Sequence, residues 1–300
     1  MQRVISTYLY ISQRLTPSLL AEIEREFRAS QKAASPAQDI GVEIFCKRDH
    51  FDYGSPQSVR ELADWFHEHS LKLHSLHAPT SRDTAANRET ASPISICDAE
   101  RVRRLDAVDE MKRALEVADT IPFRYMVLHL GGREPMTEAR KKAAFSSLEH
   151  LSIFAKQRGV TIALENTPGA LATPSNLRQF IEETKLRDLR FCFDAGHAHL
   201  DDGVTVGYET MRELVVTTHL HDNRGESDEH LLPGEGTIDW EAAMRAMGAS
   251  PAAKSGLPLV MELKEPTMPG VTPTMLLQLA IALFERLERW LALGKAKLPA

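Results

Sequence analysis

Eight short apolar runs recur along the 300 residues of this chain, and segments with helical periodicity separate them. The runs are rich in Val, Ile, Leu and Phe, which is typical of parallel strands buried on both faces. We predict strands at residues 4–10, 40–45, 71–77, 124–130, 160–166, 189–194, 214–222 and 257–263. Because successive strand–helix–strand units cross over right-handedly, eight of them predict a closed (β/α)8 barrel.

The intervening segments carry helix start signals. A threonine or serine precedes a proline before four of them, which is the usual pattern of a capping residue followed by proline at the first helical position; the pairs are Thr16-Pro17, Ser55-Pro56, Thr173-Pro174 and Thr272-Pro273. An open doubly wound sheet is the alternative, but no Gly-x-Gly-x-x-Gly follows any predicted strand. We therefore expect an α/β fold, with one TIM-barrel domain over residues 1–300 and a long loop at 78–97 over the barrel mouth.

Composition indicates an ordinary globular protein. The formal net charge of −6 gives no footprint of a nucleic-acid-binding surface, and the three cysteines form no CxxC pair. The apolar stretch at residues 275–293 is interrupted by five polar or charged residues, so it predicts an amphipathic helix and not a membrane span. The N-terminal segment lacks the apolar core of a signal peptide, and we expect a reduced, cytoplasmic setting.

Carboxylates and imidazoles stand where the apolar runs stop. Glu165 ends TIALE and Glu262 ends LVME, where a carboxylate is costly unless it is paired, metal-bound or in contact with water. One such residue would favour an ion pair; a whole set at equivalent positions favours a metal site at the carboxyl-terminal mouth of the barrel. The nine candidate ligands are His77, His129, Glu165, Asp194, His197, His219, Asp228, His230 and Glu262.

Two motifs carry most of this signal. FDAGHAH places Asp194 and His197 just beyond a strand, so that a turn can bring the imidazole back toward the carboxylate. HLHDNRGESDEHLLPGEGTIDW is more specific: His219 sits at a strand end, and Asp228 and His230 follow in the loop. The two glycines of PGEG permit a tight return to the helix predicted at residues 239–247.

Other polar residues near the strand ends have weaker signals. His221 and His199 lie two residues from stronger candidates, and a supporting hydrogen bond is the commoner role for such neighbours. Glu43 is expected either to face the substrate or to form a structural ion pair. Arg224 could bind a hydroxyl-rich or anionic substrate, or could be a solvated loop residue. Cys192 lies within a strand and is expected to be packed.

At these residues the chain resembles the xylose isomerase-like TIM-barrel superfamily, which unites sugar isomerases and epimerases with endonuclease IV-type abasic-site nucleases. The resemblance rests on LEN, FDAGHA, HLHDN, the D-x-H…PGEGTIDW loop and MEL, and it covers nearly the whole chain. In the isomerase branch four ligands hold one divalent metal, which by position implies Glu165, Asp194, His219 and Glu262. In the endonuclease branch nine ligands hold three zinc ions, which by position implies all nine candidates.

The resemblance implies two mechanisms. In the first, the protein isomerises or epimerises a small sugar, sugar acid or polyol through an enediolate, with zinc, manganese, magnesium or cobalt at the mouth. Glu165 and Glu262 would exchange the proton, and His197, Arg224 and Glu43 would contact the substrate.

The second mechanism is zinc-dependent hydrolysis of DNA at abasic sites, the one case with a nucleic-acid partner. It requires a basic rim with wedging side chains, whereas the 80–98 segment mixes charges and has no aromatic residue, which favours a sugar-like substrate. A third, non-catalytic ligand-binding barrel is disfavoured by the intact set of nine. The sequence gives no signal of an oligomeric state. Metal stoichiometry separates the two enzymes, since one equivalent favours the sugar branch.

Overall fold

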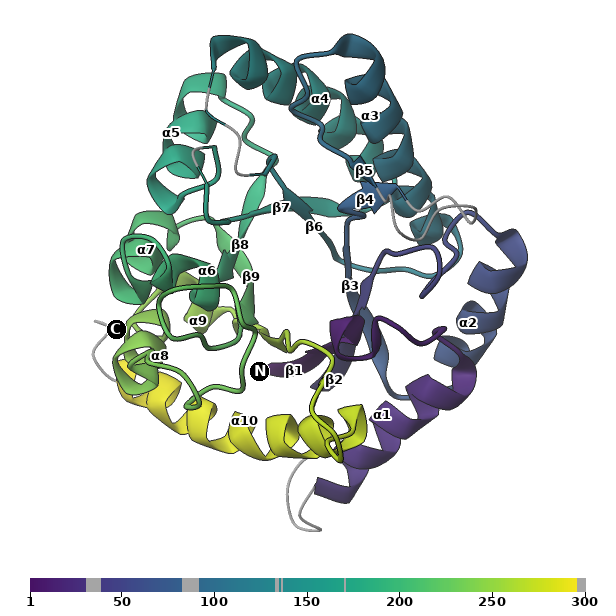
Figure 1. Cartoon of the computed structure of the whole chain (residues 1–300), viewed down its shortest axis with the longest axis vertical. Helices are drawn as coiled ribbons and strands as arrows, with labels where there is room; N and C mark the ends of the chain where they lie inside the picture. Colours follow the sequence, from purple (N-terminus) through teal and green to yellow (C-terminus); the bar gives the residue numbers. More distant parts are fainter. Residues whose placement is uncertain (31–38, 83–91, 133–134, 136, 170, 296–300) are drawn as a thin grey trace.

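The computed structural model describes residues 1–30, 39–82, 92–132, 135, 137–169 and 171–295. Its eight parallel strands close into a barrel in the order β1-β10-β9-β8-β7-β6-β3-β2 (Figure 1). The strands are β1 (Gln2–Ser6), β2 (Asp39–Phe45), β3 (Lys72–His77), β6 (Tyr125–His129), β7 (Thr161–Glu165), β8 (Arg190–Asp194), β9 (Val215–Leu220) and β10 (Leu259–Met261). The predicted α/β barrel is therefore confirmed.

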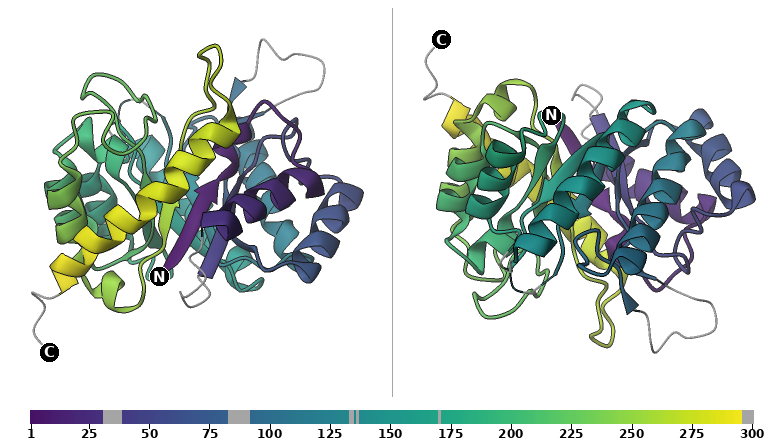
Figure 2. Two further views of the ribbon diagram at one scale, coloured as in Figure 1. Left: turned by 90° about the horizontal axis from the view of Figure 1, so that it is seen from below. Right: turned by 90° about the horizontal axis from the view of Figure 1, so that it is seen from above.

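Helices surround the barrel on the outside, and α10 crosses it next to α1 and α8 (Figures 1 and 2). The helices are α1 (Pro17–Ser30), α2 (Pro56–Glu68), α3 (Arg101–Leu115), α4 (Glu138–Lys156), α5 (Pro174–Thr184), α6 (Ala195–His199), α7 (Val204–Met211), α8 (Trp240–Gly248), α9 (Pro251–Lys254) and α10 (Pro273–Lys295). Ser55 and Thr173 cap α2 and α5 by accepting hydrogen bonds from backbone N–H groups, as their sequence pattern predicts. Among the described residues, no helix is long and apolar enough to cross a bilayer.

Several segments differ from the sequence-based prediction. Residues 7–10 form a 3-10 helix, η1 (Thr7–Tyr10), because the Ser6 side chain caps it by accepting from the Tyr8 N–H group. The ends of the predicted mouth loop pair as two short antiparallel strands, β4 (Ser81–Arg82) and β5 (Ser92–Pro93), whereas its middle lies outside the described residues. Helices α6, α7 and α9 were not predicted, since segments this short show little helical periodicity.

The barrel interior is arranged in layers, because alternate side chains of a strand point to the same face. On β6, β7 and β8 the middle layer consists of Val127, Ala163 and Cys192, all fully buried. Two residues further along, the same faces carry His129, Glu165 and Asp194, the last residues of these strands. The carboxyl-terminal mouth is thus polar, directly above a thin apolar layer.

Candidate metal centre

All nine side chains predicted as ligands meet at the carboxyl-terminal mouth. His77, His129, Glu165 and Asp194 each end a strand, His219 is the next-to-last residue of β9, and Glu262 directly follows β10. Parallel pairing brings His129 beside Glu165 and Asp194 beside His219. Ligand atoms from residues far apart in sequence therefore converge because the barrel aligns the strand ends.

Glu165 is at the centre of the first group. Its Oε2 atom lies 3.3 Å from His77 Nε2 and 3.2 Å from His129 Nε2. The Glu165 side chain is fully buried, and both of its oxygens lack an aligned hydrogen-bond partner, as does His129 Nε2. Burial alone would raise the pKa of Glu165, but the charges of His129 and His219 hold it well below its usual range. The result is a buried carboxylate suited to a cation between it and the two imidazoles.

The second group shares Glu165 and adds Asp194, His219 and Glu262, with one ligand atom of each within 4.8 Å of the others. His219 Nδ1 lies 3.3 Å from Oε2 of Glu165, 3.3 Å from Oε2 of Glu262 and 3.7 Å from Oδ2 of Asp194. This nitrogen is also buried without an aligned hydrogen-bond partner. Three carboxylates and one imidazole form a donor set that manganese, magnesium, cobalt or zinc can occupy.

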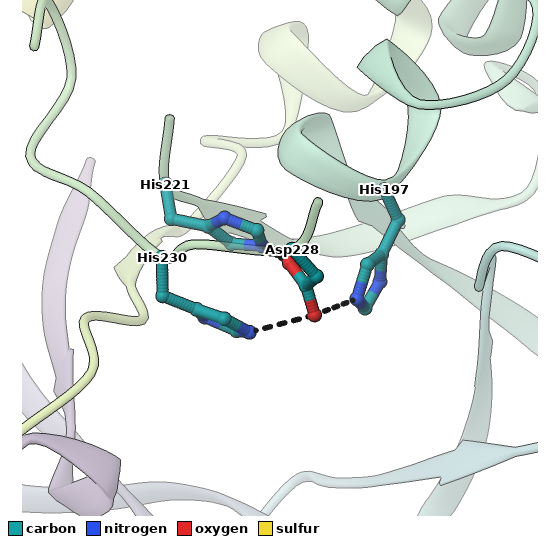
Figure 3. Close-up of side chains that lie close together, drawn as sticks. All are labelled: His197, His221, Asp228 and His230. Carbon is teal, nitrogen blue, oxygen red and sulfur yellow. Dashed lines mark hydrogen bonds and ion pairs between the residues drawn. The ribbon is translucent and has the colours of Figure 1, made fainter. Parts of the chain in front are cut away.

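The third group consists of His197, His221, Asp228 and His230. His197 Nε2 and His230 Nε2 each lie 3.1 Å from Asp228 Oδ2 and approach it from opposite sides (Figure 3). The His221 ring stacks on that of His230 with 3.8 Å between centroids. Three imidazoles around one carboxylate are a donor set typical of zinc.

Hydrogen bonds behind the ligands fix their orientation. The Nδ1 atom of His77 bonds to the Ala78 carbonyl oxygen, and that of His230 to the Glu262 carbonyl oxygen. Because a carbonyl only accepts, Nδ1 carries the proton in each ring and leaves Nε2 free as a metal ligand. The supporting bonds therefore select the tautomers that metal binding requires.

Asp222 anchors the loop that carries Asp228 and His230. Its carboxylate accepts hydrogen bonds from the backbone N–H groups of Gly234 and Ile238 and from the Trp240 indole. The loop must pass close to this carboxylate: a Cβ on Gly236 would lie 2.3 Å from both Asp222 Oδ1 and the Asn223 carbonyl oxygen. Gly236, one of the two PGEG glycines predicted to permit a tight return, therefore lies where a side chain would not fit.

The structure shows the contacts of three residues whose roles the sequence did not decide. Glu43 is fully buried behind His219 and contacts its Nε2 atom at 3.1 Å. The Arg224 guanidinium is more than half exposed and pairs with Glu229 in the same loop. His199 bonds to Thr237 and lies outside the three groups.

Sequence reasoning undervalued His221 and missed two aromatic residues. His221 lies inside the third group because Gly196 leaves room for it: a Cβ there would be 2.0 Å from the imidazole. Tyr8 and Phe45 form a half-buried aromatic wall beside the ligands, with Phe45 stacked on His77 and Tyr8 against His230. The alternation of side chains along β9 could have signalled His221, whereas Tyr8 lies in the unpredicted η1.

Glu165, Cys192 and His219 also lie close together, but they are a weaker set of ligands. Burial raises the pKa of the Cys192 thiol well above its usual range. A protonated thiol is a poor metal ligand, so Cys192 acts as a packed residue of the middle layer, as expected from its place within a strand.

The chain is thus a TIM barrel whose carboxyl-terminal mouth gathers imidazoles and carboxylates that could hold metal ions. A family model for xylose isomerase-like TIM barrels matches residues 37–285, and the chain belongs to this family. The recognised resemblance is thereby confirmed.

Relatives within the family differ in what their names describe. The uncharacterized protein MJ1311 of Methanocaldococcus jannaschii is 28% identical over 247 residues, which cover 79% of this chain and 75% of that protein. A probable endonuclease 4 of Natronomonas pharaonis is 29% identical over 190 residues, 56% of this chain and 66% of the relative. Members of the family thus include predicted nucleases.

Two solved structures with the same fold are named for an epimerase and for a bound zinc atom. A D-tagatose 3-epimerase-like protein superimposes with a TM-score of 0.71 at 22% identity, covering 99% of both chains. The IOLI protein with a bound zinc atom has a TM-score of 0.72 at 19% identity, covering 96% of this chain and 98% of that one. At these identities the likeness concerns the fold.

Proposed function

We propose that this protein is a divalent-metal-dependent isomerase or epimerase of a small sugar, sugar acid or polyol. The observation that carries the proposal is the second group, in which Glu165, Asp194, His219 and Glu262 bring ligand atoms within 4.8 Å of one another. Buried carboxylate oxygens without aligned partners are costly, and a bound cation would satisfy them. The zinc-bound and epimerase-like neighbours support the same assignment.

The two glutamates provide the acid–base chemistry. A divalent cation in the second group would polarise the substrate carbonyl. Glu165 and Glu262 come from β7 and from the end of β10, so their carboxylates can flank the carbon that loses its proton. One carboxylate removes the proton to give an enediolate and the other returns a proton, either to the neighbouring carbon or to the opposite face of the same carbon.

The aromatic wall supports a sugar-like substrate. Tyr8 and Phe45 present half-buried rings with centroids 5.0 Å apart, and Phe45 continues onto His77 at 4.3 Å. Aromatic faces of this kind bury the apolar C–H surface of a small molecule while polar groups beside them fix its orientation. We assign substrate contact to Tyr8 and His197; Arg224 can join them only if it leaves Glu229.

Proton exchange tests the proposal. The metal-loaded protein is incubated in deuterium oxide with a panel of ketoses, aldoses and sugar acids, and NMR follows loss of the C–H signal next to the carbonyl. We expect exchange with at least one compound and its loss in Glu165→Gln and Glu262→Gln. Glu61→Gln, on the exposed face of α2, is the matched control and keeps full exchange. A metal-loaded protein that exchanges no proton across the panel contradicts the proposal.

The first and third groups favour a second candidate, a zinc-dependent phosphodiester hydrolase acting at abasic sites. Together the three groups have ligands for three neighbouring cations, and the first and second groups share Glu165. Relatives of this chain include proteins named probable endonuclease 4. Clustered cations can activate water and stabilise a leaving oxygen. Cleavage of an abasic-site duplex by the zinc-loaded protein, lost in His129→Gln, supports this function; an intact duplex at three bound equivalents of zinc contradicts it.

A further inference from the structure

A pocket lies at the opposite, amino-terminal end of the barrel, where β6, β7 and β8 begin. Its volume is about 300 Å³, and it lies below the apolar layer of Val127, Ala163 and Cys192. Three of its lining residues are the first residues of their strands: Tyr125 of β6, Thr161 of β7 and Arg190 of β8. Each stands four residues before a metal-centre residue on the same face of its strand, which puts the pocket roughly 13 Å from the metal centre.

The composition of this lowest layer is unusual for a barrel. Large branched apolar side chains normally fill such layers, whereas the first residues of β6, β7 and β8 carry a phenol, a hydroxyl and a guanidinium here. Arg124, Lys156 and Ser152 add to the lining from the edge, and Asp188 is its one carboxylate. The lining therefore carries three positive charges and one negative charge.

Two of the positive charges lack an acidic partner within the described part of the chain. Lys156 Nζ binds Asp188 at 3.0 Å, which neutralises both. Arg190 donates from Nη1 to the carbonyl oxygens of Arg187 and Leu189, at 2.8 Å each, and forms no ion pair among the described residues. Arg124 likewise contacts no described carboxylate and lies over the Tyr125 ring, 5.2 Å from its centroid.

The positive charges of both guanidinium groups influence the Tyr125 phenol. Burial raises the pKa of the Tyr125 phenol, and the charges of Arg124 and Arg190 oppose this rise. Arg124 and Arg190 line the same pocket as the Tyr125 side chain, and Thr161 lies beside Tyr125 on the neighbouring strand. Two guanidinium groups with free N–H donors, held by backbone carbonyls and an aromatic ring, form a preorganised receptor for a tetrahedral anion.

We propose that the amino-terminal mouth is a binding site for a phosphate group, either free or on a small phosphorylated molecule. Arg124 and Arg190 bind its oxygens, and the hydroxyl groups of Tyr125 and Thr161 complete the contacts. The site is separate from the metal centre and from the proposed reaction, since the layer of Val127, Ala163 and Cys192 lies between them.

Calorimetry with inorganic phosphate tests the site. The protein is first stripped of metal with a chelator, so that the metal centre cannot hold the anion, and ionic strength is kept constant. We expect binding with 1:1 stoichiometry, weakened about tenfold or more in Arg124→Gln/Arg190→Gln, because each lost bond is charge-assisted. Arg60→Gln/Arg101→Gln removes the same charge from exposed positions of α2 and α3 and leaves the affinity unchanged.

A second measurement places the anion and identifies its source. Anomalous diffraction from crystals soaked in selenate is expected to show the ion between Arg124 and Arg190. A hexose phosphate that binds more tightly than inorganic phosphate identifies a phosphorylated molecule, and equal affinities identify free phosphate. Equal binding by the double variant, selenate found only elsewhere, or equal binding of the unphosphorylated hexose would each overturn the proposal. Arg124→Gln alone keeps the test valid if the double variant does not fold.

Discussion

His219 and Glu43 form a fully buried pair in which each nitrogen of the imidazole has a different task. Nε2 lies 3.1 Å from Glu43 Oε1, and Nδ1 faces Glu165 and Glu262 at 3.3 Å. Burial favours a neutral Glu43, but the charge of His219 holds the pKa of this carboxyl below its usual range. When a cation replaces the second proton of the His219 ring, ionised Glu43 accepts the hydrogen bond from Nε2–H and leaves Nδ1 as the ligand atom, which makes Glu43 a positioning residue.

Glu43→Gln is predicted to weaken metal binding to the second group by about 10–100-fold, because the amide no longer fixes the charge and tautomer of His219. Competition with a chelating dye measures this affinity without relying on catalysis. The matched control is Glu110→Gln, another buried carboxylate on α3, whose partners are Arg113 on the same helix and Arg48 and Tyr53 in the loop before α2. The control lowers stability but not metal affinity; equal affinity for Glu43→Gln and the wild type would refute the positioning role.

His221 is predicted to be a ligand of the third group. Its Nε2 atom lies 3.1 Å from Asp194 Oδ2 and 3.9 Å from Asp228 Oδ1, between the second and third groups, and its Nδ1 atom is buried without an aligned partner. We expect His221→Asn to weaken binding of zinc in the third group about tenfold or more, since asparagine can keep a hydrogen bond to Asp194 but offers no imidazole nitrogen.

The absorption spectrum of the cobalt-substituted protein measures this effect, because its intensity reports the geometry and number of ligands. His199→Asn serves as the control: it lies two residues beyond His197 and bonds to Thr237. An unchanged cobalt spectrum and stoichiometry in His221→Asn would show that the residue only packs against Gly196.

Much of the barrel and its mouth could be predicted because both follow from local periodicity. The apolar runs locate the strands. The alternation of side chains along a strand then shows which face a polar residue at its end, such as Glu165, occupies. The partners of Glu43 and Arg224 could not be predicted, since they depend on the folded positions of the side chains around them, and periodicity does not describe these. For Glu43 the partner is His219, 176 residues away; for Arg224 it is Glu229, only five residues on.

The aromatic wall of Tyr8 and Phe45 also could not be predicted from periodicity. Tyr8 belongs to an apolar run predicted as strand, but it lies in η1, where Ser6 caps the helix, and its ring lies against Phe45 and His230. Side-chain hydrogen bonds of this kind compete with regular strand structure, and apolar periodicity contains no signal for them.

Gly236→Ala is predicted to destabilise the protein by about 2–4 kcal/mol, because the new Cβ would lie 2.3 Å from a backbone oxygen and from the Asp222 carboxylate. Displacement of the loop would also remove metal from the third group while the second group keeps its ion. Thermal unfolding and metal analysis measure the two effects. Gly256→Ala is the control, because nothing lies within 4 Å of a Cβ built there. Its φ of +84°, which Gly236 does not share, should cost about 1 kcal/mol and no metal.

Glu24 on α1 is predicted to stabilise the fold in a pH-dependent way. Burial alone would raise its pKa, but hydrogen bonds from Ser70, His69 and Arg28 lower it to about 2, against an ordinary value of 4.5. A carboxyl whose pKa is lower in the folded state stabilises above its unfolded value and loses this contribution as pH falls through the folded value. Glu24→Gln should therefore lose about 2–3 kcal/mol at pH 7, and the difference from the wild type should shrink progressively below pH 4.5.

Denaturant unfolding between neutral and acid pH checks the Glu24 contribution, with the metal removed so that ligand protonation does not contribute. Glu61→Gln on α2 is exposed and should follow the wild type at every pH. The Glu24 carboxylate accepts from Ser70 Oγ at 2.6 Å and from His69 Nδ1 at 2.7 Å, so it joins α1 to the segment that leads into β3. A Glu24→Gln deficit that stays constant down to the acid limit would mean that packing of this junction, and not the charge, carries the stabilisation.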